Sequence, residues 1–181
     1  MYIIITVLLL LLIFIILNYN KIIKLKVRAN GAWSDIDVQL KKRYDLINNL
    51  VNVVKGYSDF EKEVLVNVTE KRNIAMSEKS IGKRAYSENN ISNSLKSLFA
   101  VVENYPDLKA NNSYLHLQKQ LVEIEDNISY SRRYYNAVVR DFNQIIHIFP
   151  QNAIAFIFGF NRLEYFEIKN SEERDGINVD I

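Results

Sequence analysis

The chain has 181 residues, 49% of them hydrophobic, and its 23 basic and 21 acidic side chains leave a formal net charge of +2. Because it has no cysteine and only two histidines, disulfides, thiolate metal centres, a cysteine nucleophile and a multi-histidine metal site are excluded. Five glycines and two prolines are too few for a turn-rich β-protein, and the nearly balanced charge gives no reason to expect nucleic acid as a partner.

Residues 1–20 are predicted to be a transmembrane anchor. The stretch Tyr2–Tyr19 has no charged side chain, and as a helix it is roughly 27 Å long, just enough for the hydrocarbon core of a bilayer. A cleaved signal peptide is the alternative, but no basic region precedes the stretch and Leu17-Asn18-Tyr19 is not a small-residue cleavage site. We therefore expect an uncleaved anchor.

Residues 21–31 are predicted to be a basic juxtamembrane segment. Its four cations follow the apolar stretch directly: Lys21, Lys24, Lys26 and Arg28. The positive-inside rule then predicts a single-pass protein whose N-terminus lies outside the cell and whose remaining residues lie in the cytoplasm. If the four cations are only the solvated start of a helix, they still lie at the membrane surface, against anionic headgroups.

Residues 32–168 are predicted to form an all-α domain, an antiparallel up-and-down four-helix bundle. The helix-breaking residues Gly31, Gly56, Gly82 and Pro106 divide it, and the segments between them have the apolar spacing of helices. The second helix is expected to begin with a capping box at Ser58–Glu61, and a loop is expected over 80–90. The four helices are expected at about 32–55, 59–79, 91–105 and 117–149.

The fourth expected helix has the most regular apolar pattern of the chain. Its steps of four and three form a heptad seam, interrupted only by Ser131: Leu117, Leu121, Ile124, Ile128, Tyr135, Val138, Phe142, Ile145 and Phe149. After Pro150, the apolar residues 153–160 predict a short helix and a strap that cover one open end of the bundle. The alternative is a docking patch for the bilayer or a partner. Residues 169–181 are predicted to be a disordered tail.

A polar face runs beside this seam and includes Gln118, Glu125, Ser129, Arg132, Asn136, Asn143 and His147. Partners could lie on the first helix, with Arg43 facing Glu125 and Asp37 facing Arg132. The face is then either a solvated flank, a register-setting polar network or a catalytic cleft. The candidate structural network consists of Asp37, Arg43, Glu125, Arg132 and Asn136.

Catalytic, cofactor-binding and metal-ligating residues are not expected. No nucleophile–base pair, phosphate-binding glycine loop or zinc-protease motif is evident. His116 and His147 would lie roughly 46 Å apart on one straight helix, so they cannot share a ligand within one chain.

Two blocks resemble the LemA family of bacterial membrane proteins. The first is Trp33–Val51, followed by Val54–Tyr57 and Glu61. The second runs from Tyr105–Asn111 through Leu117-Gln118, Glu125, Arg132–Asn136, Asn143 and Phe149–Asn152 to Gly159-Phe160 and Tyr165–Glu167. The resemblance implies a membrane anchor followed by an antiparallel four-helix bundle, in a bacterial cell membrane, and no established enzymatic activity.

These features predict a non-enzymatic, membrane-tethered helical module. It would contact the lipid bilayer and bind a membrane or membrane-associated protein at the bilayer surface, and no nucleic acid is expected. The alternative is a structural organiser of the membrane that acts as a homo-oligomer. An enzyme is the third hypothesis and would need an unrecognised site, in the region between Glu125 and Arg132.

Overall fold

The computed structural model describes residues 1–57 and 61–167. These residues contain helices and no β-strand, so the all-α fold expected from the sequence is confirmed. The expected capping box depends on residues 58–60, which lie outside the described residues, as does the expected tail 169–181. The helices are α1 (Tyr2–Lys55), α2 (Lys62–Ser77), α3 (Ile81–Val102), α4 (Pro106–Lys109), α5 (Asn112–Ile145) and α6 (Gln151–Ile157).

The chain divides into two compact units. The first unit contains Met1–Lys41 and Asp126–Tyr165, and therefore the N-terminal part of α1, the C-terminal part of α5, and α6. The second unit contains Lys42–Glu125 and continues from Phe166, so it holds the rest of α1 and α5 together with α2, α3 and α4.

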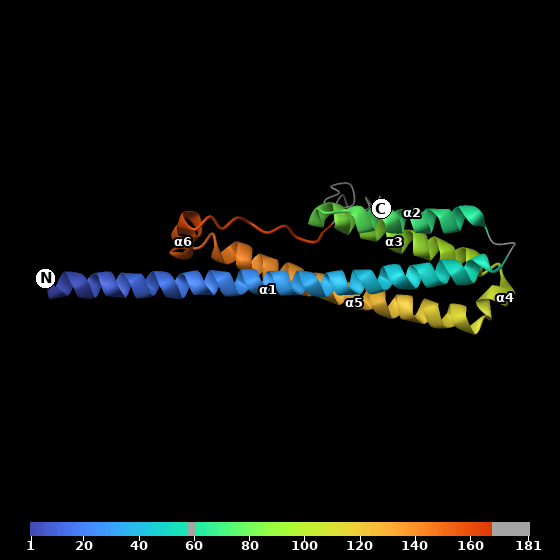
Figure 1. Cartoon of the computed structure of the whole chain (residues 1–181), viewed down its shortest axis with the longest axis horizontal. Coiled ribbons are helices and arrows are strands. Elements are labelled where there is room, and N and C mark those ends of the chain that lie inside the picture. Colours follow the sequence, from blue (N-terminus) through green and yellow to red (C-terminus); the bar gives the residue numbers. More distant parts are fainter. Residues whose placement is uncertain (58–60, 168–181) are drawn as a thin grey trace, which may run out of the picture. The chain divides into compact units, whose positions relative to one another are not determined.

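Helix α1 is one uninterrupted helix of 54 residues (Figure 1). The break expected at Gly31 is wrong, because Gly31 lies exposed inside the helix. Ala29 and Ala32 are buried on either side of it. Their packing outweighs the roughly 1 kcal/mol by which glycine disfavours a helix interior. The anchor, the basic segment and the first bundle helix expected from the sequence are therefore a single element.

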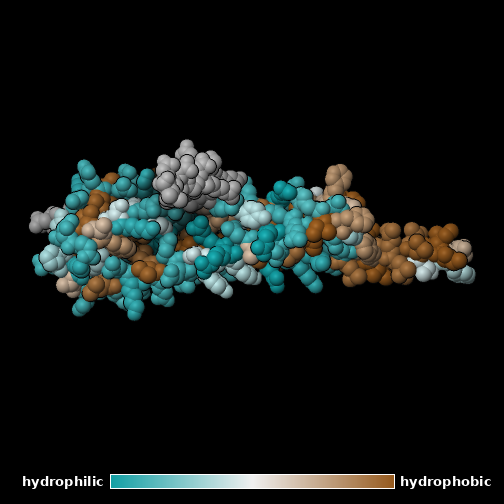
Figure 2. Space-filling model, turned by 180° about the vertical axis from the view of Figure 1, so that it is seen from behind, coloured by the Kyte–Doolittle hydropathy of each residue, from teal (hydrophilic) through white to brown (hydrophobic). Residues whose placement is uncertain are grey.

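The N-terminal part of α1 is long and apolar enough to cross a membrane, and no other helix in the described part of the chain is. None of its most apolar 18-residue stretch is buried. Figure 2 shows this end of the chain as mainly hydrophobic surface with a few pale residues, whereas hydrophilic residues cover much of the rest of the face in view. Apolar side chains that stay exposed in this way are typical of a segment that lies in lipid.

Substitution of Gly31 by alanine tests whether α1 is continuous. A Cβ atom at this position would meet nothing within 4 Å, so we expect alanine to raise the free energy of unfolding by about 0.5–1 kcal/mol. The control is Gly159→Ala, which should destabilise the protein because Gly159 has a φ of +68°. Thermal unfolding of the full chain in detergent measures both. No gain from Gly31→Ala would indicate a break in the helix.

The second unit is a small bundle in which α1, α2, α3 and α5 run alternately in opposite directions (Figure 1). Its core is formed by the apolar stripe that the sequence predicts for α1, which includes Ile47, Val51 and Val54. From the other helices it receives Val68, Ala75, Ile91, Leu95, Leu98, Leu108, Tyr114, Leu117, Leu121 and Ile124, among other residues.

The boundaries of two elements in this unit differ from the expectation. The loop expected over 80–90 is wrong, because α3 begins at Ile81 and includes Gly82 and the two asparagines that follow Glu88. Pro106 does not end α3, which already ends at Val102. Instead Pro106 begins the short helix α4, where its fixed φ and missing N–H suit the first helical turn.

Helix α5 buries the expected heptad seam from Leu117 to Ile145. The expected last member, Phe149, is 80% exposed, because the helix ends at Ile145 and the chain turns before α6. In the first unit the N-terminal part of α1 packs against α5, and the rings of Trp33 and Tyr135 lie 5.6 Å apart.

Residues 158–165 of the first unit form a strap that follows α6. Asn143 on α5 holds it by donating to the Leu163 carbonyl at 3.0 Å and accepting from the Leu163 N–H at 2.9 Å. Burial raises the pKa of Tyr135 to about 12, so its hydroxyl is a neutral donor, and it donates to the Glu164 carbonyl at 2.9 Å. The strap therefore lies along the side of α5, whereas the sequence predicted that it covers an open end of the bundle.

Candidate functional site

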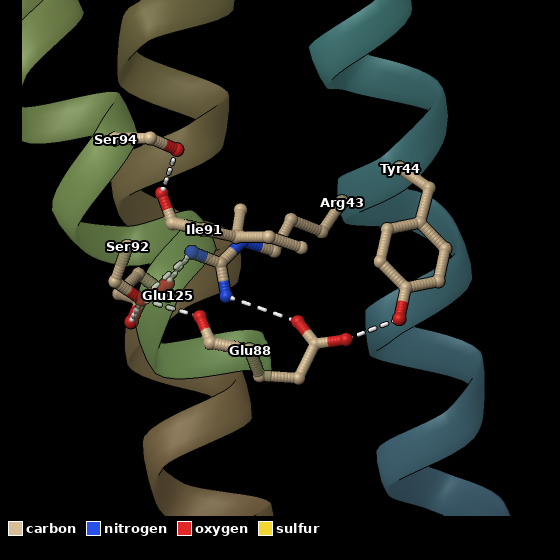
Figure 3. A network of polar contacts seen from close by, with 7 residues as sticks. All are labelled: Arg43, Tyr44, Glu88, Ile91, Ser92, Ser94 and Glu125. Carbon is tan, nitrogen blue, oxygen red and sulfur yellow. Dashed lines mark hydrogen bonds and ion pairs between the residues drawn. The ribbon is translucent and has the colours of Figure 1, made fainter. Parts of the chain in front are cut away.

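A buried ion-pair network lies in the core of the second unit, and Arg43 is at its centre (Figure 3). Arg43 lies one residue from the buried stripe of α1, and its whole residue is 1% exposed. Its Nη1 atom is 3.4 Å from Glu88 Oε2 on α3, and its Nη2 atom is 3.0 Å from Glu125 Oε2 on α5. Nη2 also donates to Ser92 Oγ at 2.8 Å. One guanidinium therefore connects three helices.

Two further contacts complete the connections around Glu88. The Tyr44 hydroxyl donates a hydrogen bond to Glu88 Oε1, on the side of the carboxylate away from Arg43 (Figure 3). The Ser92 hydroxyl donates to Glu125 Oε1 at 2.9 Å. Each oxygen of the two carboxylates thus has a polar partner, which a buried carboxylate requires if it is to be tolerated.

Helix α2 joins the network through Arg72. Its Nε atom donates to the Tyr44 carbonyl at 2.9 Å, and its guanidinium lies 6.0 Å from the centre of the Tyr44 ring. The network therefore includes polar contacts from all four long helices of the second unit. Polar contacts of this kind add little net stability, but they disfavour other registers because any shift leaves a buried charge without its partner.

Burial has the largest effect on the titrating groups of the network. It raises the pKa of Glu88, and the negative charge of Glu125 adds to this, while the hydrogen bond from Tyr44 and the charges of Arg43 and Arg84 oppose it. Burial and the neighbouring charge of Glu88 also raise the pKa of Tyr44 well above its usual value. The Tyr44 hydroxyl therefore stays protonated at neutral pH and acts as a donor.

The charged side chains of the network differ in their exposure to solvent. The side chains of Arg43 and Glu88 are each 2% exposed, whereas that of Glu125 is 45% exposed. In the part of the chain that the structure describes, no group of three or more potential metal ligands comes together. The ion pairs of the network neutralise charges between α1, α3 and α5.

Of the pairs expected from the sequence, Arg43 and Glu125 do form an ion pair. The other expected residues belong to the first unit, where Asp37 is exposed and Arg132 and Asn136 are half-buried, and each of the three has at least one interaction partner. Glu88, Tyr44, Ser92 and Arg72 were not expected in the network from the sequence. Glu88 was missed because its segment was expected to be a loop.

Arg132 and Arg133 form a matched pair for testing the polar face of α5. Arg132 is half-buried and Arg133 is exposed, since the two positions differ by roughly 100° around the helix. We expect Arg132→Ala to lower the melting temperature of the full chain in detergent clearly more than Arg133→Ala does, because exposed charges contribute under about 1 kcal/mol. Equal melting temperatures would mean that the face is a solvated flank.

The protein is all-α, and its described residues contain one candidate membrane anchor, the N-terminal part of α1. The same helix continues into the buried ion-pair network. Residues 32–181 match the sequence model of the LemA family, and the chain belongs to that family.

Similar proteins include two magnetosome proteins and one LemA protein. The chain is 29% identical to magnetosome protein MamQ 2 of Paramagnetospirillum magneticum and 26% identical to magnetosome protein MamQ of Magnetospirillum gryphiswaldense. Both alignments cover 86% of this chain and 66% of the relative, so the matched region spans about two thirds of the length of those relatives. The chain is also 28% identical to protein LemA of Metamycoplasma hominis, over 86% of this chain and 75% of that protein.

Proposed function

We propose that this protein is a non-enzymatic, membrane-tethered helical module that binds a protein partner at the surface of a bacterial cell membrane. The observation that carries the proposal is the continuity of α1, whose exposed apolar stretch runs directly into residues that pack in a folded unit. A helix of this kind keeps a folded surface close to the bilayer, where its partner would be another membrane or membrane-associated protein.

The proposed orientation has the N-terminus outside and the folded units in the cytoplasm. It is supported by the four cations that follow the apolar stretch, Lys21, Lys24, Lys26 and Arg28, all of which are exposed. In this orientation they would face the anionic headgroups of the cytoplasmic leaflet.

Cysteine labelling in intact cells tests the orientation without background, because the chain has no native cysteine. We expect a membrane-impermeant maleimide to label Tyr2→Cys in intact cells, and to label Ser97→Cys, exposed on α3, only after lysis. The opposite pattern would contradict the proposed orientation. Loss of the Tyr2→Cys label from the mature protein would identify the stretch as a cleaved signal peptide.

The proposed partner surface is the outer face of α5 around Tyr130 and Tyr134. These tyrosines are 68% and 45% exposed and lie one helical turn apart. Tyrosine is enriched at protein interfaces because it buries a large ring while its hydroxyl keeps a hydrogen bond. Arg133 lies beside them and is also exposed, and arginine is enriched at interfaces as well.

Co-purification from detergent-solubilised membranes tests this surface. We expect a discrete protein to co-purify with the native chain and to be lost with the double variant Tyr130→Ala and Tyr134→Ala. The matched control is Tyr86→Ala, which removes a tyrosine that is 49% exposed on α3 and should leave the co-purified protein in place. A result in which both variants retain the same proteins would remove the support for this surface.

A further inference from the structure

Helix α6 combines a buried face with an unusually apolar exposed face. Ile154 and Ala155 pack into a cluster with Ile22 of α1 and with Phe142, Ile145 and Ile146 at the end of α5. The remaining apolar side chains around α6 point to solvent: Ile148 is 47%, Phe149 80%, Phe156 89%, Ile157 73% and Phe158 51% exposed. From Phe149 to Phe160 no residue is charged, although Asn152 is polar and exposed. This surface therefore lacks the charged residues that usually cover a helix in water.

The contacts of α6 place it at one particular level of α1. Gln151 Nε2 donates to Asn18 Oδ1 at 2.8 Å, and the ring of Phe158 lies 4.7 Å from that of Tyr19. Asn18 and Tyr19 lie at the end of the apolar stretch Tyr2–Tyr19, and the first charged residue, Lys21, is two positions after Tyr19. In Figure 1, α6 accordingly lies beside α1, close to the N-terminal apolar stretch of that helix.

The same level carries the basic residues that would meet lipid headgroups. Lys26 Nζ lies 5.6 Å from the ring centre of Phe160, the first large residue after the turn at Gly159. Along α1, Lys26 is roughly 10 Å from Tyr19, which is comparable to the depth over which an interfacial helix inserts its apolar face. Along α1, the level of the Phe158 ring at Tyr19 therefore comes before the level of Lys26. This is the order in which a helix leaving the hydrocarbon core of a bilayer reaches the headgroups.

We propose that α6 and the residues beside it are a second membrane contact, which inserts its exposed face into the interface of the bilayer that α1 crosses. The occupant of this surface is lipid, because the surface adjoins the end of the exposed apolar stretch of α1 at Asn18 and Tyr19, and Lys26 lies beside it at Phe160. Hydrophobic surface in Figure 2 accordingly extends from the N-terminal stretch onto adjoining parts of the chain. The contact also supplements a span of only roughly 27 Å, which is slightly shorter than a typical hydrocarbon core. This inference rests on the membrane tether of the proposed function.

Depth measurements on the full chain test the proposal. Single cysteines at Phe156 and Ile157 would carry an environment-sensitive fluorophore, in vesicles of phosphatidylcholine and phosphatidylglycerol in equal amounts that contain nitroxide-labelled lipid. We expect blue-shifted emission that the nitroxide lipid quenches. Ser129→Cys is the aqueous control, because Ser129 is exposed on α5 and lies roughly 24 Å along that helix from Ile145. Leu10→Cys is the control within the membrane.

Two results would overturn the proposal while leaving the anchor intact. The fluorophores at Phe156 and Ile157 could behave like the one at Ser129, which would show that α6 lies in water. They could instead be blue-shifted but insensitive to nitroxide lipid, which would show that protein, such as a second copy of the chain, covers this surface. If Leu10→Cys is itself not quenched, the tether of the proposed function fails, and this inference fails with it.

Discussion

Replacement of Arg43 by alanine is expected to lower the free energy of unfolding by about 3–5 kcal/mol, the usual cost of removing one partner from a buried ion pair. The loss arises mainly from Glu88, whose side chain is 2% exposed and would remain in the core without its principal cation. Glu125 contributes less because its side chain is 45% exposed and water can replace Arg43 there. Thermal unfolding of the full chain in detergent, followed by circular dichroism, measures the effect.

The matched control is Arg140→Ala, because the ion pair of Arg140 with Asp141 is exposed on both sides. It should shift the melting temperature little. The double variant Arg43→Ala and Glu88→Gln should recover part of the loss, since the buried charge that Arg43 neutralises is then absent. If Arg43→Ala is no worse than Arg140→Ala, the network does not hold these helices together.

The second large effect is a pH dependence of stability that originates at Glu88. Burial raises the folded-state pKa of Glu88 above the ordinary value of 4.5. At pH values between the ordinary pKa and the raised folded-state pKa of Glu88, the folded chain binds more protons than the unfolded chain. The free energy of unfolding therefore falls as the pH rises through this window. The charged groups that face Glu88 are Arg43 on α1, Glu125 on α5 and Arg84 on α3 itself, and Tyr44 on α1 also faces it.

Glu88→Gln should remove this pH dependence, because glutamine keeps the shape of the side chain and does not titrate. Melting temperatures of both chains, measured from pH 4 upwards, should show the native chain losing stability relative to the variant as the pH rises, and then a constant difference. A native chain that gains on the variant with rising pH would mean that the arginines lower the pKa of Glu88 more than burial raises it.

Much of the fold could be predicted from the apolar spacing. The seam of α5 and the stripe of α1 were predicted correctly because burial of side chains at three- and four-residue steps determines which face of a helix is inside. The Arg43–Glu125 pair was predictable for the same reason, since both residues border an apolar stripe. Gly31 was misjudged because helix propensity is a weak preference, which the packing of Ala29 and Ala32 overrides.

Glu88 could not be found while its segment was expected to be a loop. Gly82 and the pair Asn89-Asn90 lower helix propensity, and this concealed a stripe that continues backwards from Ile91. Once α3 is extended to Ile81, Ala85, Glu88, Ile91 and Leu95 recur at steps of three and four. A charged residue at a stripe position is then a signal of a buried partner. The partner itself depends on how the helices pack, which no single helix encodes.

The strap shows a second limit of sequence-based prediction. Its apolar residues were expected to cover the end of a bundle, and its actual path is set by polar contacts to the backbone. Asn143 binds both the N–H and the carbonyl of Leu163, a pairing that has no signature in the sequence. The strap also brings the rings of Phe158 and Phe160 beside the ring of Tyr19.

Photo-crosslinking in living cells tests the central claim, a tethered module that binds a partner, most directly. A photoreactive residue at Tyr134 should give a discrete crosslinked product between this chain and a different membrane-associated protein, whereas the same residue at Tyr86 should not. A product with the mass of two copies of this chain would favour the self-associating organiser instead. Identical products from both positions, or no product from Tyr134, would contradict the claim that this face of α5 binds a partner.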